Sequence, residues 1–225
     1  MEHGFQAYGF HMTAFKNLFG TLLVVIMAWL AAAPAMADPV GIVGFGDSLM
    51  AGYRLGPGES FADKLQAALK KDGYDVTVAN AGVSGDTTSD GLARLDWSVP
   101  DGTDLVILEL GANDMLRGVD PALTRKNLEA MIERLKERGI KVLLFGMKAA
   151  PNLGPDYQKA FDAIYPDLAA RYSLPLYPFF LDGVAGHPDL QLDDGMHPNA
   201  KGVDRMVEGA LPIVEKALGR PGKSS

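Results

Sequence analysis

Short apolar segments rich in β-formers alternate with segments of helical periodicity from residue 40 to residue 218. Apolar runs of five to seven residues are typical of buried strands, and apolar positions three or four apart are typical of helices. The predicted strands are residues 40–45, 75–79, 104–110, 141–147 and 176–179. The predicted helices are residues 60–71, 87–95, 121–138, 155–172 and 199–218, and Pro212 predicts a kink in the last of them.

Capping signals support several of these helices. Ser60 and Asp63 form a capping-box pattern at the start of helix 60–71. Pro121 opens helix 121–138 and Gly139 directly follows it, which is the usual asymmetry of helix ends. Asp86 is placed to cap helix 87–95, since a side-chain oxygen there can accept from a first-turn N–H.

Strands that alternate with helices at this spacing favour a parallel sheet covered on both faces. The predicted fold is therefore a three-layer α/β/α sandwich with a central, mostly parallel five-stranded sheet of the flavodoxin-like kind. Ligand sites of such sheets lie at the carboxyl ends of the strands. The sequence shows no repeat and no interdomain linker, so residues 38–219 are expected to form one domain and residues 220–225 a flexible tail.

The first 37 residues have the pattern of a secretory signal peptide. Residues 18–33 are almost wholly apolar, Lys16 precedes them, and Ala35-Met36-Ala37 is a small-x-small cleavage site. We expect cleavage after Ala37 and a periplasmic or secreted protein, with Met12 as an alternative start. The other interpretation is an uncleaved anchor, although the apolar run is short for a membrane span of about 20 residues.

Charge and composition exclude several classes of function. The net charge is −7, which argues against nucleic acid and anionic lipid as partners. The chain has no cysteine, so disulfides, thiolate catalysis and Cys-ligated zinc are excluded. Only His187 and His197 lie beyond the leader, too few for a histidine-rich metal site. We expect a monomer with no metal, no cofactor and no stable membrane insertion after cleavage.

Two short motifs far apart in the chain together indicate acyl transfer. Ser48, in Gly46-Asp47-Ser48-Leu49, follows the first predicted strand and is placed as a nucleophile. Asp194 precedes His197 by three residues, a spacing that lets the carboxylate accept the imidazole Nδ1–H. The Nε2 atom is then free to take a proton from a nucleophile. Either motif alone is most often a plain turn or a surface pair.

Two further polar blocks fall at the same edge of the predicted sheet. Gly82 follows the second strand in Asn80-Ala81-Gly82, and Asn113 follows the third in Gly111-Ala112-Asn113-Asp114. Taken alone, Gly82 could be an ordinary loop glycine and Asn113 an ordinary turn asparagine. Their convergence with Ser48 and His197 at the carboxyl edge is what favours a common site.

With these four blocks in order, the chain resembles the SGNH, or GDSL, hydrolase family over residues 40–218. Within that family it is most similar to the small exported acyl-hydrolases with thioesterase, arylesterase and lysophospholipase activities. The resemblance implies that Ser48 attacks an acyl carbonyl, His197 acts as general base and Asp194 orients it. It also implies an oxyanion hole made by the Ser48 N–H, the Gly82 N–H and the Asn113 amide. The implied substrate is a small-molecule or lipid acyl ester.

Other residues near the motifs have structural interpretations. Asp47 and Asp114 are expected to accept from backbone N–H groups in their turns. His187 precedes Pro188 and has no carboxylate at the spacing found before His197, so an exposed loop position is expected. An acyl pocket and the ordinary core are equally good interpretations of three apolar side chains, Met115, Leu116 and Met147.

Two alternatives stay open from the sequence. A carbohydrate O-deacetylase would use the same site on acetylated sugars. A flavodoxin-like binding module would instead cradle a phosphate at the loop 44–48, although Asp47 would repel the anion and no Walker or dinucleotide pattern follows.

Overall fold

The computed structural model describes residues 1, 3–4 and 38–219. The predicted signal peptide falls almost wholly outside these residues, and the predicted tail 220–225 lies outside them. The unit described below is the folded part that begins at Pro39. In the described part of the chain no helix is long and apolar enough to cross a membrane.

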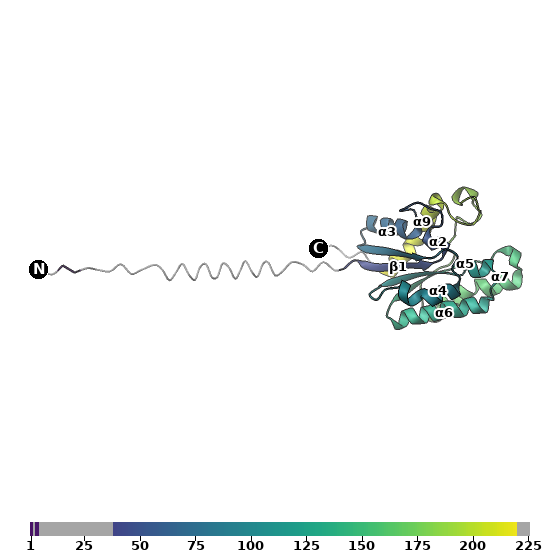
Figure 1. Ribbon diagram of the computed structural model, residues 1–225, viewed down its shortest axis with the longest axis horizontal. Coiled ribbons are helices and arrows are strands. Elements are labelled where there is room, and N and C mark those ends of the chain that lie inside the picture. Colours follow the sequence, from purple (N-terminus) through teal and green to yellow (C-terminus); the bar gives the residue numbers. More distant parts are fainter. Residues whose placement is uncertain (2, 5–37, 220–225) are drawn as a thin grey trace. The chain divides into compact units, whose positions relative to one another are not determined.

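A five-stranded sheet forms the centre of this unit (Figure 1). Its strands are β1 (Val40–Gly46), β2 (Val76–Gly82), β3 (Leu105–Glu109), β4 (Lys141–Phe145) and β5 (Leu176–Tyr177). They lie in the order β2-β1-β3-β4-β5, and every neighbouring pair is parallel. The predicted flavodoxin-like sandwich is confirmed, because this is the order of that doubly wound fold.

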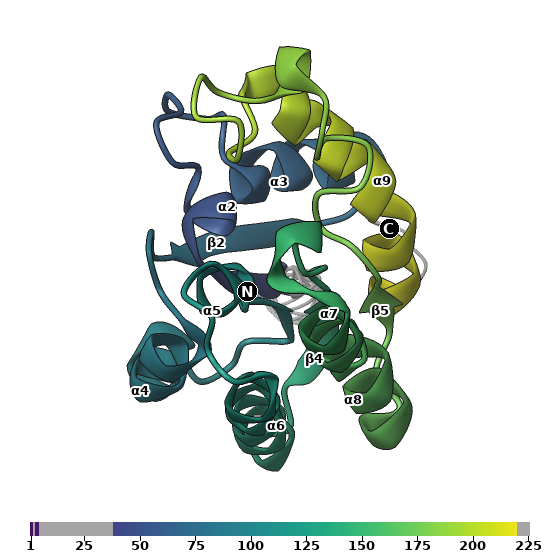
Figure 2. The same cartoon turned by 90° about the vertical axis from the view of Figure 1, so that its right-hand side faces the viewer.

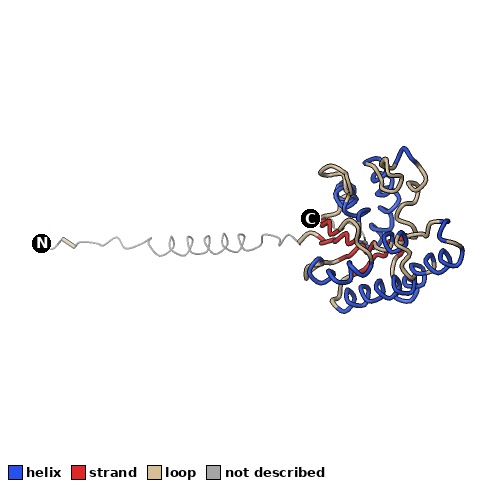
Figure 3. The backbone as a smooth tube through the Cα atoms, turned by 45° about the vertical axis from the view of Figure 1, so that its right-hand side comes forward, coloured by secondary structure: helices blue, strands red, loops and turns tan. Residues whose placement is uncertain are grey.

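Helices cover both faces of the sheet. Figure 2 shows α3 (Phe61–Lys71) and α9 (Ala200–Leu218) on one face, and α4 (Thr88–Ser98), α6 (Pro121–Glu137) and α8 (Ile164–Tyr172) on the other. Figure 3 shows the same layering, with helices on either side of the strands. Leu105 to Leu108 of β3 are almost completely buried, as expected for a central strand of a parallel sheet.

The capping residues explain where two of these helices begin. Ser60 accepts from the Asp63 N–H, so the predicted cap of α3 is confirmed. The prediction for α4 is wrong by one residue, because Thr87 is the cap and forms a capping box with Asp90. Asp86 instead forms an ion pair with Arg94 at 2.5 Å.

Prolines account for two differences from the predicted elements. The single helix expected over 155–172 is two helices, α7 (Pro155–Asp162) and α8. Pro166 has no N–H to donate to the Asp162 carbonyl and is tolerated only in the first turn of a new helix. The fifth strand ends at Tyr177 because Pro178 cannot continue a ladder. By contrast, α9 runs as one helix across Pro212.

Short helices that the pattern did not predict follow the carboxyl ends of the strands. They are α2 (Ser48–Ala51) after β1 and α5 (Ala112–Leu116) after β3. Two 3₁₀ turns, η1 (Pro151–Leu153) and η2 (Pro188–Leu190), lie after β4 and β5. Four or five residues are too few to show a helical period in the sequence. Ser48 lies in α2 and Asn113 in α5.

Arg94 ties the carboxyl ends of two strands together from beneath. Its guanidinium donates to the Gly46 carbonyl at the end of β1 and to the Ala81 carbonyl in β2, both at 2.9 Å. The side chains of Arg94 and Asp86 are only 8% and 12% exposed. The Arg94 guanidinium also lies 4.1 Å from the centre of the Phe45 ring. The ion pair is therefore a buried one with additional partners.

We predict that Arg94→Met lowers the free energy of unfolding by about 3–5 kcal/mol, because Asp86 would be left as a buried unpaired charge. Urea denaturation followed by circular dichroism measures the change. The matched control is Arg134→Met, since Arg134 pairs with Asp96 at 3.5 Å and both side chains are largely exposed. Its cost should be under about 1 kcal/mol. Equal effects of the two substitutions would contradict the prediction.

Candidate active site

Ser48 is the first residue of α2, directly beyond the end of β1. The cap of this short helix is Asp47, whose Oδ1 accepts from the Leu49 N–H at 3.0 Å. Asp47 is completely buried and Ser48 is 9% exposed. The interpretation of Asp47 as a turn residue is confirmed by this bond. The cap thus holds the Ser48 hydroxyl at the carboxyl edge of the sheet.

Ser48, His197 and Asp194 form one hydrogen-bonded chain. His197 Nε2 lies 2.9 Å from Ser48 Oγ, and His197 Nδ1 lies 2.8 Å from Asp194 Oδ2. Both distances suit hydrogen bonds in which the carboxylate fixes the imidazole tautomer. A base held in this way can remove the hydroxyl proton of a serine.

Asp194 is held by the turn that it shares with His197. Its Oδ1 accepts from the Met196 N–H at 2.9 Å and from the His197 N–H at 3.0 Å. These bonds, above all that from the His197 backbone, lower the pKa of Asp194 to about 2. The carboxylate is therefore ionised throughout the neutral range. Oδ1 of Asp194 therefore stabilises the turn, and Oδ2 binds the imidazole.

Tyr53 is a neighbour of the imidazole that the sequence did not reveal. Its ring centre lies 4.5 Å from that of His197, and the two rings are tilted by 39°. Next to it, Arg54 pairs with Asp193 at 2.6 Å. The loop after α2 is thereby joined to the loop that carries His197. No spacing rule connects residues 53 and 197, so only the fold could show this contact.

The amide of Asn113 lies between two loops of the site. Asn113 is in α5, and its Nδ2 donates to Asp47 Oδ2 at 3.1 Å and to the Asp86 carbonyl at 3.0 Å. The next residue, Asp114, accepts from the Thr88 N–H at 2.8 Å. Asp114 is thus structural, as expected, but it holds the start of α4 rather than its own turn.

The resemblance implied that the Gly82 N–H is an oxyanion donor, but in the structure this N–H has a partner of its own. Gly82 is the last residue of β2, and its N–H donates to Asn80 Oδ1 at 2.9 Å. A Cβ at this position would overlap the backbone of Ala51, so the glycine lets β2 approach α2. Gly85 lies three residues further on, has a φ of +89° and directly precedes Asp86. The N–H of Gly82 is therefore already hydrogen-bonded to the Asn80 side chain. Gly85, by contrast, is next to Asp86, whose carbonyl accepts from the Asn113 amide.

A pocket of about 510 Å³ opens beside Ser48 and His197. Its wall includes Met115, Leu116 and Met147, the three residues for which the sequence left an acyl pocket and the ordinary core equally open. Met115 and Met147 are nearly buried, whereas Leu116 is 57% exposed. Other residues of the wall are Ala112, Ala149, Pro151, Phe179 and Leu181. An apolar lining beside a nucleophile suits a substrate with a hydrocarbon part.

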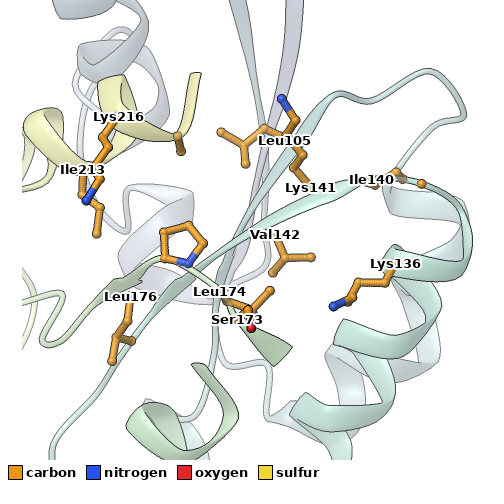
Figure 4. A pocket seen from close by; sticks show the side chains of 13 residues that line it. Leu105, Lys136, Ile140, Lys141, Val142, Ser173, Leu174, Leu176, Ile213 and Lys216 are labelled. Atoms are coloured by element: carbon orange, nitrogen blue, oxygen red, sulfur yellow. The ribbon is translucent and has the colours of Figure 1, made fainter. Parts of the chain in front are cut away.

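A second cavity, of about 720 Å³, lies at the opposite edge of the sheet (Figure 4). It is lined by residues at the amino ends of β3 and β4, such as Leu105 and Lys141, and by Ile213 of α9. None of the residues of the Ser48 site reaches this edge. The pocket of about 510 Å³ is therefore the one that adjoins Ser48 and His197.

His187 is exposed at the start of η2, as expected. Among the described residues, no group of three histidine or acidic side chains is arranged to hold a metal ion.

Several known proteins resemble this chain in sequence. The GDSL-like lipase/acylhydrolase family matches residues 45–205. An arylesterase of Vibrio mimicus is 42% identical over 198 residues, which cover 88% of this chain and 98% of the relative. The thioesterase 1/protease 1/lysophospholipase L1 of Escherichia coli K12 is 38% identical over 214 residues, with 90% and 98% covered.

A solved structure is similar to this chain as well. The crystal structure of AlinE4, an esterase of the SGNH-hydrolase family, is 49% identical and covers 83% of this chain and 100% of its own, with a TM-score of 0.68. This chain belongs to the GDSL-like lipase/acylhydrolase family. It is an ester-hydrolysing enzyme, as the sequence predicts.

We predict that Asp194→Asn lowers kcat by about 10⁴-fold, the size of the corresponding effect in a serine protease. The Asn oxygen can still accept the two backbone N–H groups, so the turn is kept. Its NH₂ group would face His197 Nδ1 and favour the tautomer in which Nε2 carries the proton. That tautomer cannot accept the Ser48 proton, and initial-rate kinetics with a p-nitrophenyl ester measure the loss.

The control is Asp193→Asn, which changes the neighbouring exposed carboxylate and leaves Asp194 intact. Since Arg54 is the side chain with which Asp193 pairs among the described residues, kcat should stay within a few-fold of that of the unmodified protein. A large loss of kcat in Asp193→Asn, with a small loss in Asp194→Asn, would contradict the prediction. It would show that Asp193 is the carboxylate that orients His197.

Proposed function

We propose that this protein is a serine acyl-hydrolase that cleaves carboxylic esters, and activated thioesters, through an acyl-enzyme on Ser48. The observation that supports this most directly is the 2.9 Å contact between Ser48 Oγ and His197 Nε2, with Asp194 on the other imidazole nitrogen. This arrangement has the parts of a nucleophile, a general base and an orienting carboxylate.

In the acylation half of the reaction, Ser48 Oγ attacks the acyl carbonyl carbon while its proton passes to His197 Nε2. The resulting imidazolium is stabilised by the ionised Asp194 carboxylate. Collapse of the tetrahedral intermediate breaks the bond to the alcohol or thiol, which leaves with the proton from Nε2. In the second half, His197 takes a proton from water, the hydroxide attacks the acyl-enzyme, and the proton returns to Ser48 as the acid departs.

The oxyanion needs donors that are in place before the charge develops. The N–H of Ser48 lies at the start of α2, where first-turn N–H groups have no partner within the helix. We propose the Asn113 amide as the second donor, with its bond to the neutral Asp86 carbonyl exchanged for one to the oxyanion. For the backbone donor of the adjacent loop we propose Gly85 in place of Gly82, because the Gly82 N–H is bound to Asn80.

The pocket favours an acyl ester with a hydrocarbon chain as the substrate. Met115, Leu116 and Met147 would contact that chain. A sugar ring would need several polar groups, and this wall is mainly apolar, so the carbohydrate O-deacetylase is the less favoured alternative. The names of the relatives, an arylesterase and a thioesterase/lysophospholipase, support the same substrate class.

We predict that Ser48→Ala abolishes ester hydrolysis, with a loss on the order of 10⁶ in kcat as for the serine of a protease triad. The fold should be unchanged by circular dichroism. A fluorophosphonate probe should label the unmodified protein and leave Ser48→Ala unlabelled. Ser173→Ala, at the far edge of the sheet, is the control and should keep both activity and labelling. Esterase activity of a few per cent in a folded Ser48→Ala variant would exclude Ser48 as the nucleophile.

We also propose that the protein is exported and that residues 1–37 are its signal peptide. The proposal rests on Lys16, the apolar run 18–33 and the Ala35-Met36-Ala37 site. It would act outside the cytoplasm as a monomer.

We predict that the mature protein begins Asp38-Pro39-Val40 when it is expressed in a Gram-negative host. Edman degradation or intact mass of the periplasmic fraction measures this terminus. Because signal peptidase needs small residues at both positions, Ala35→Leu and Ala37→Leu should each leave the uncleaved chain in the membrane fraction. A full-length chain of the unaltered sequence in that fraction would contradict cleavage.

A further inference from the structure

Glu109 is a carboxyl group buried directly beneath the proposed active site. It is the last residue of β3 and is 0% exposed. Its Oε2 accepts from the backbone N–H of Asp47 at 3.3 Å, whereas Oε1 has no hydrogen-bond partner in the described part of the chain. Gly46 makes this approach possible, because a Cβ at Gly46 would overlap the Glu109 carboxyl. A strand interior would normally hold an apolar side chain here.

Within residues 38–219, no cationic side chain is paired with the Glu109 carboxyl. From the β1–α2 turn it faces the carboxyl of Asp47, and from α8 it faces the phenol of Tyr165, which donates to the Leu110 carbonyl at 2.9 Å. From α5, Asp114 is bound to Thr88. From α4, the Arg94 guanidinium is engaged with Asp86 and the Gly46 carbonyl.

Burial, and then the charge of Asp47, raise the pKa of Glu109 well above its usual value. Burial also raises the pKa of Asp47 to about 6, since the bonds from Leu49 and Asn113 offset only part of the cost. Two adjacent buried carboxyls do not ionise together. Asp47 has a hydrogen-bond donor on each carboxylate oxygen, whereas Glu109 accepts a single bond at 3.3 Å, so the pair favours one charge, on Asp47, with the proton on Glu109.

We propose that protonated Glu109 is a positioning residue for the reaction, which aligns Ser48 and Asn113 through Asp47. The inference rests on the proposed acyl-hydrolase function and deepens it. Each link is a hydrogen bond of the structure: Glu109 holds the Asp47 backbone, Asp47 Oδ1 holds the turn that begins at Ser48, and Asp47 Oδ2 holds the Asn113 amide. Neutral Glu109 can accept the Asp47 N–H without repelling the Asp47 carboxylate.

Ionisation of Glu109 at alkaline pH would put a second negative charge next to Asp47. Repulsion would displace the Asp47 carboxylate and with it the Asn113 amide. Displacement of about 1 Å in such a site can cost about 10²-fold in rate. The effect should fall on kcat rather than KM, because Asn113 is proposed to act on the charge that develops in the transition state.

The experiment compares Glu109→Gln and Glu109→Leu with the unmodified protein. Gln keeps an acceptor oxygen for the Asp47 N–H and cannot ionise, whereas Leu removes the acceptor. Initial rates with p-nitrophenyl butyrate, corrected for spontaneous hydrolysis, would be measured from pH 6 to pH 10.5. Circular dichroism at each pH reports the fold, and Glu137→Gln, an exposed glutamate of α6, is the matched control.

We expect kcat of the unmodified protein and of Glu137→Gln to fall at alkaline pH with KM little changed. Glu109→Gln should keep near-normal kcat at pH 7 and lose this alkaline fall, and Glu109→Leu should have a kcat about 10²-fold lower at pH 7. An alkaline fall that is the same in Glu109→Gln would overturn the proposal, even if Glu109→Leu does not fold. Absence of fluorophosphonate labelling at Ser48 would instead count against the proposed function itself.

Urea unfolding gives a second readout of the protonated state. Glu109 ionises above its ordinary pKa in the unfolded chain but stays protonated in the folded one, so the unfolded state binds fewer protons. Its contribution to the free energy of unfolding therefore falls as pH rises from about 4.5 towards the folded pKa. Glu109→Gln should lose this part of the pH dependence. A dependence identical in both proteins would show that Glu109 is already ionised in the fold.

Discussion

The buried carboxylate of Asp47 is the constraint around which the active edge of the sheet is arranged. A carboxylate without solvent must be surrounded by hydrogen-bond donors, and Asp47 has the Leu49 N–H on one oxygen and the Asn113 amide on the other. Those donors come from the turn after β1 and from α5 after β3. Satisfying one buried charge therefore places two separate loops at fixed positions around Ser48.

Arg94 provides a buried positive charge on the other side of the same strand ends. Its guanidinium holds the Gly46 and Ala81 carbonyls and pairs with Asp86, whose own carbonyl accepts from Asn113. The loops after β1, β2 and β3 are thereby linked through short charged bridges rather than through apolar packing alone. Such a network is rigid, and rigid donors are what stabilisation of an oxyanion requires.

His197 reaches the site by a different route. The Asp194–His197 turn is held by its own hydrogen bonds, by the bond from the Leu192 N–H to the His197 carbonyl at 2.8 Å, and by the Arg54–Asp193 pair. Besides that exposed pair, the Tyr53 ring and the hydrogen bond between His197 Nε2 and Ser48 Oγ connect this turn to the chain around Ser48.

The sequence by itself determined the layer order, the parallel sheet and the positions of Ser48, Asp194 and His197 at its carboxyl edge. These follow from local rules: apolar runs give strands, the intervening helices force parallel pairing, and a D-x-x-H spacing closes on one turn. Local rules also explain two wrong predictions. The helix predicted over 155–172 is interrupted before Pro166, and the strand predicted over 176–179 ends before Pro178, although apolar periodicity alone continues through both prolines.

Tertiary structure decided everything that depends on distance between loops. It placed Tyr53 against His197, turned the Gly82 N–H to Asn80, and buried Glu109 beneath Asp47, although in sequence Glu109 is one polar residue in an apolar strand. No periodicity or spacing encodes these contacts, because they join segments whose separation is set by strand order and register. The chemistry of each residue, and partners within one turn such as Asp194 and His197, can be predicted from the sequence, but partners on separate loops depend on how the sheet brings those loops together.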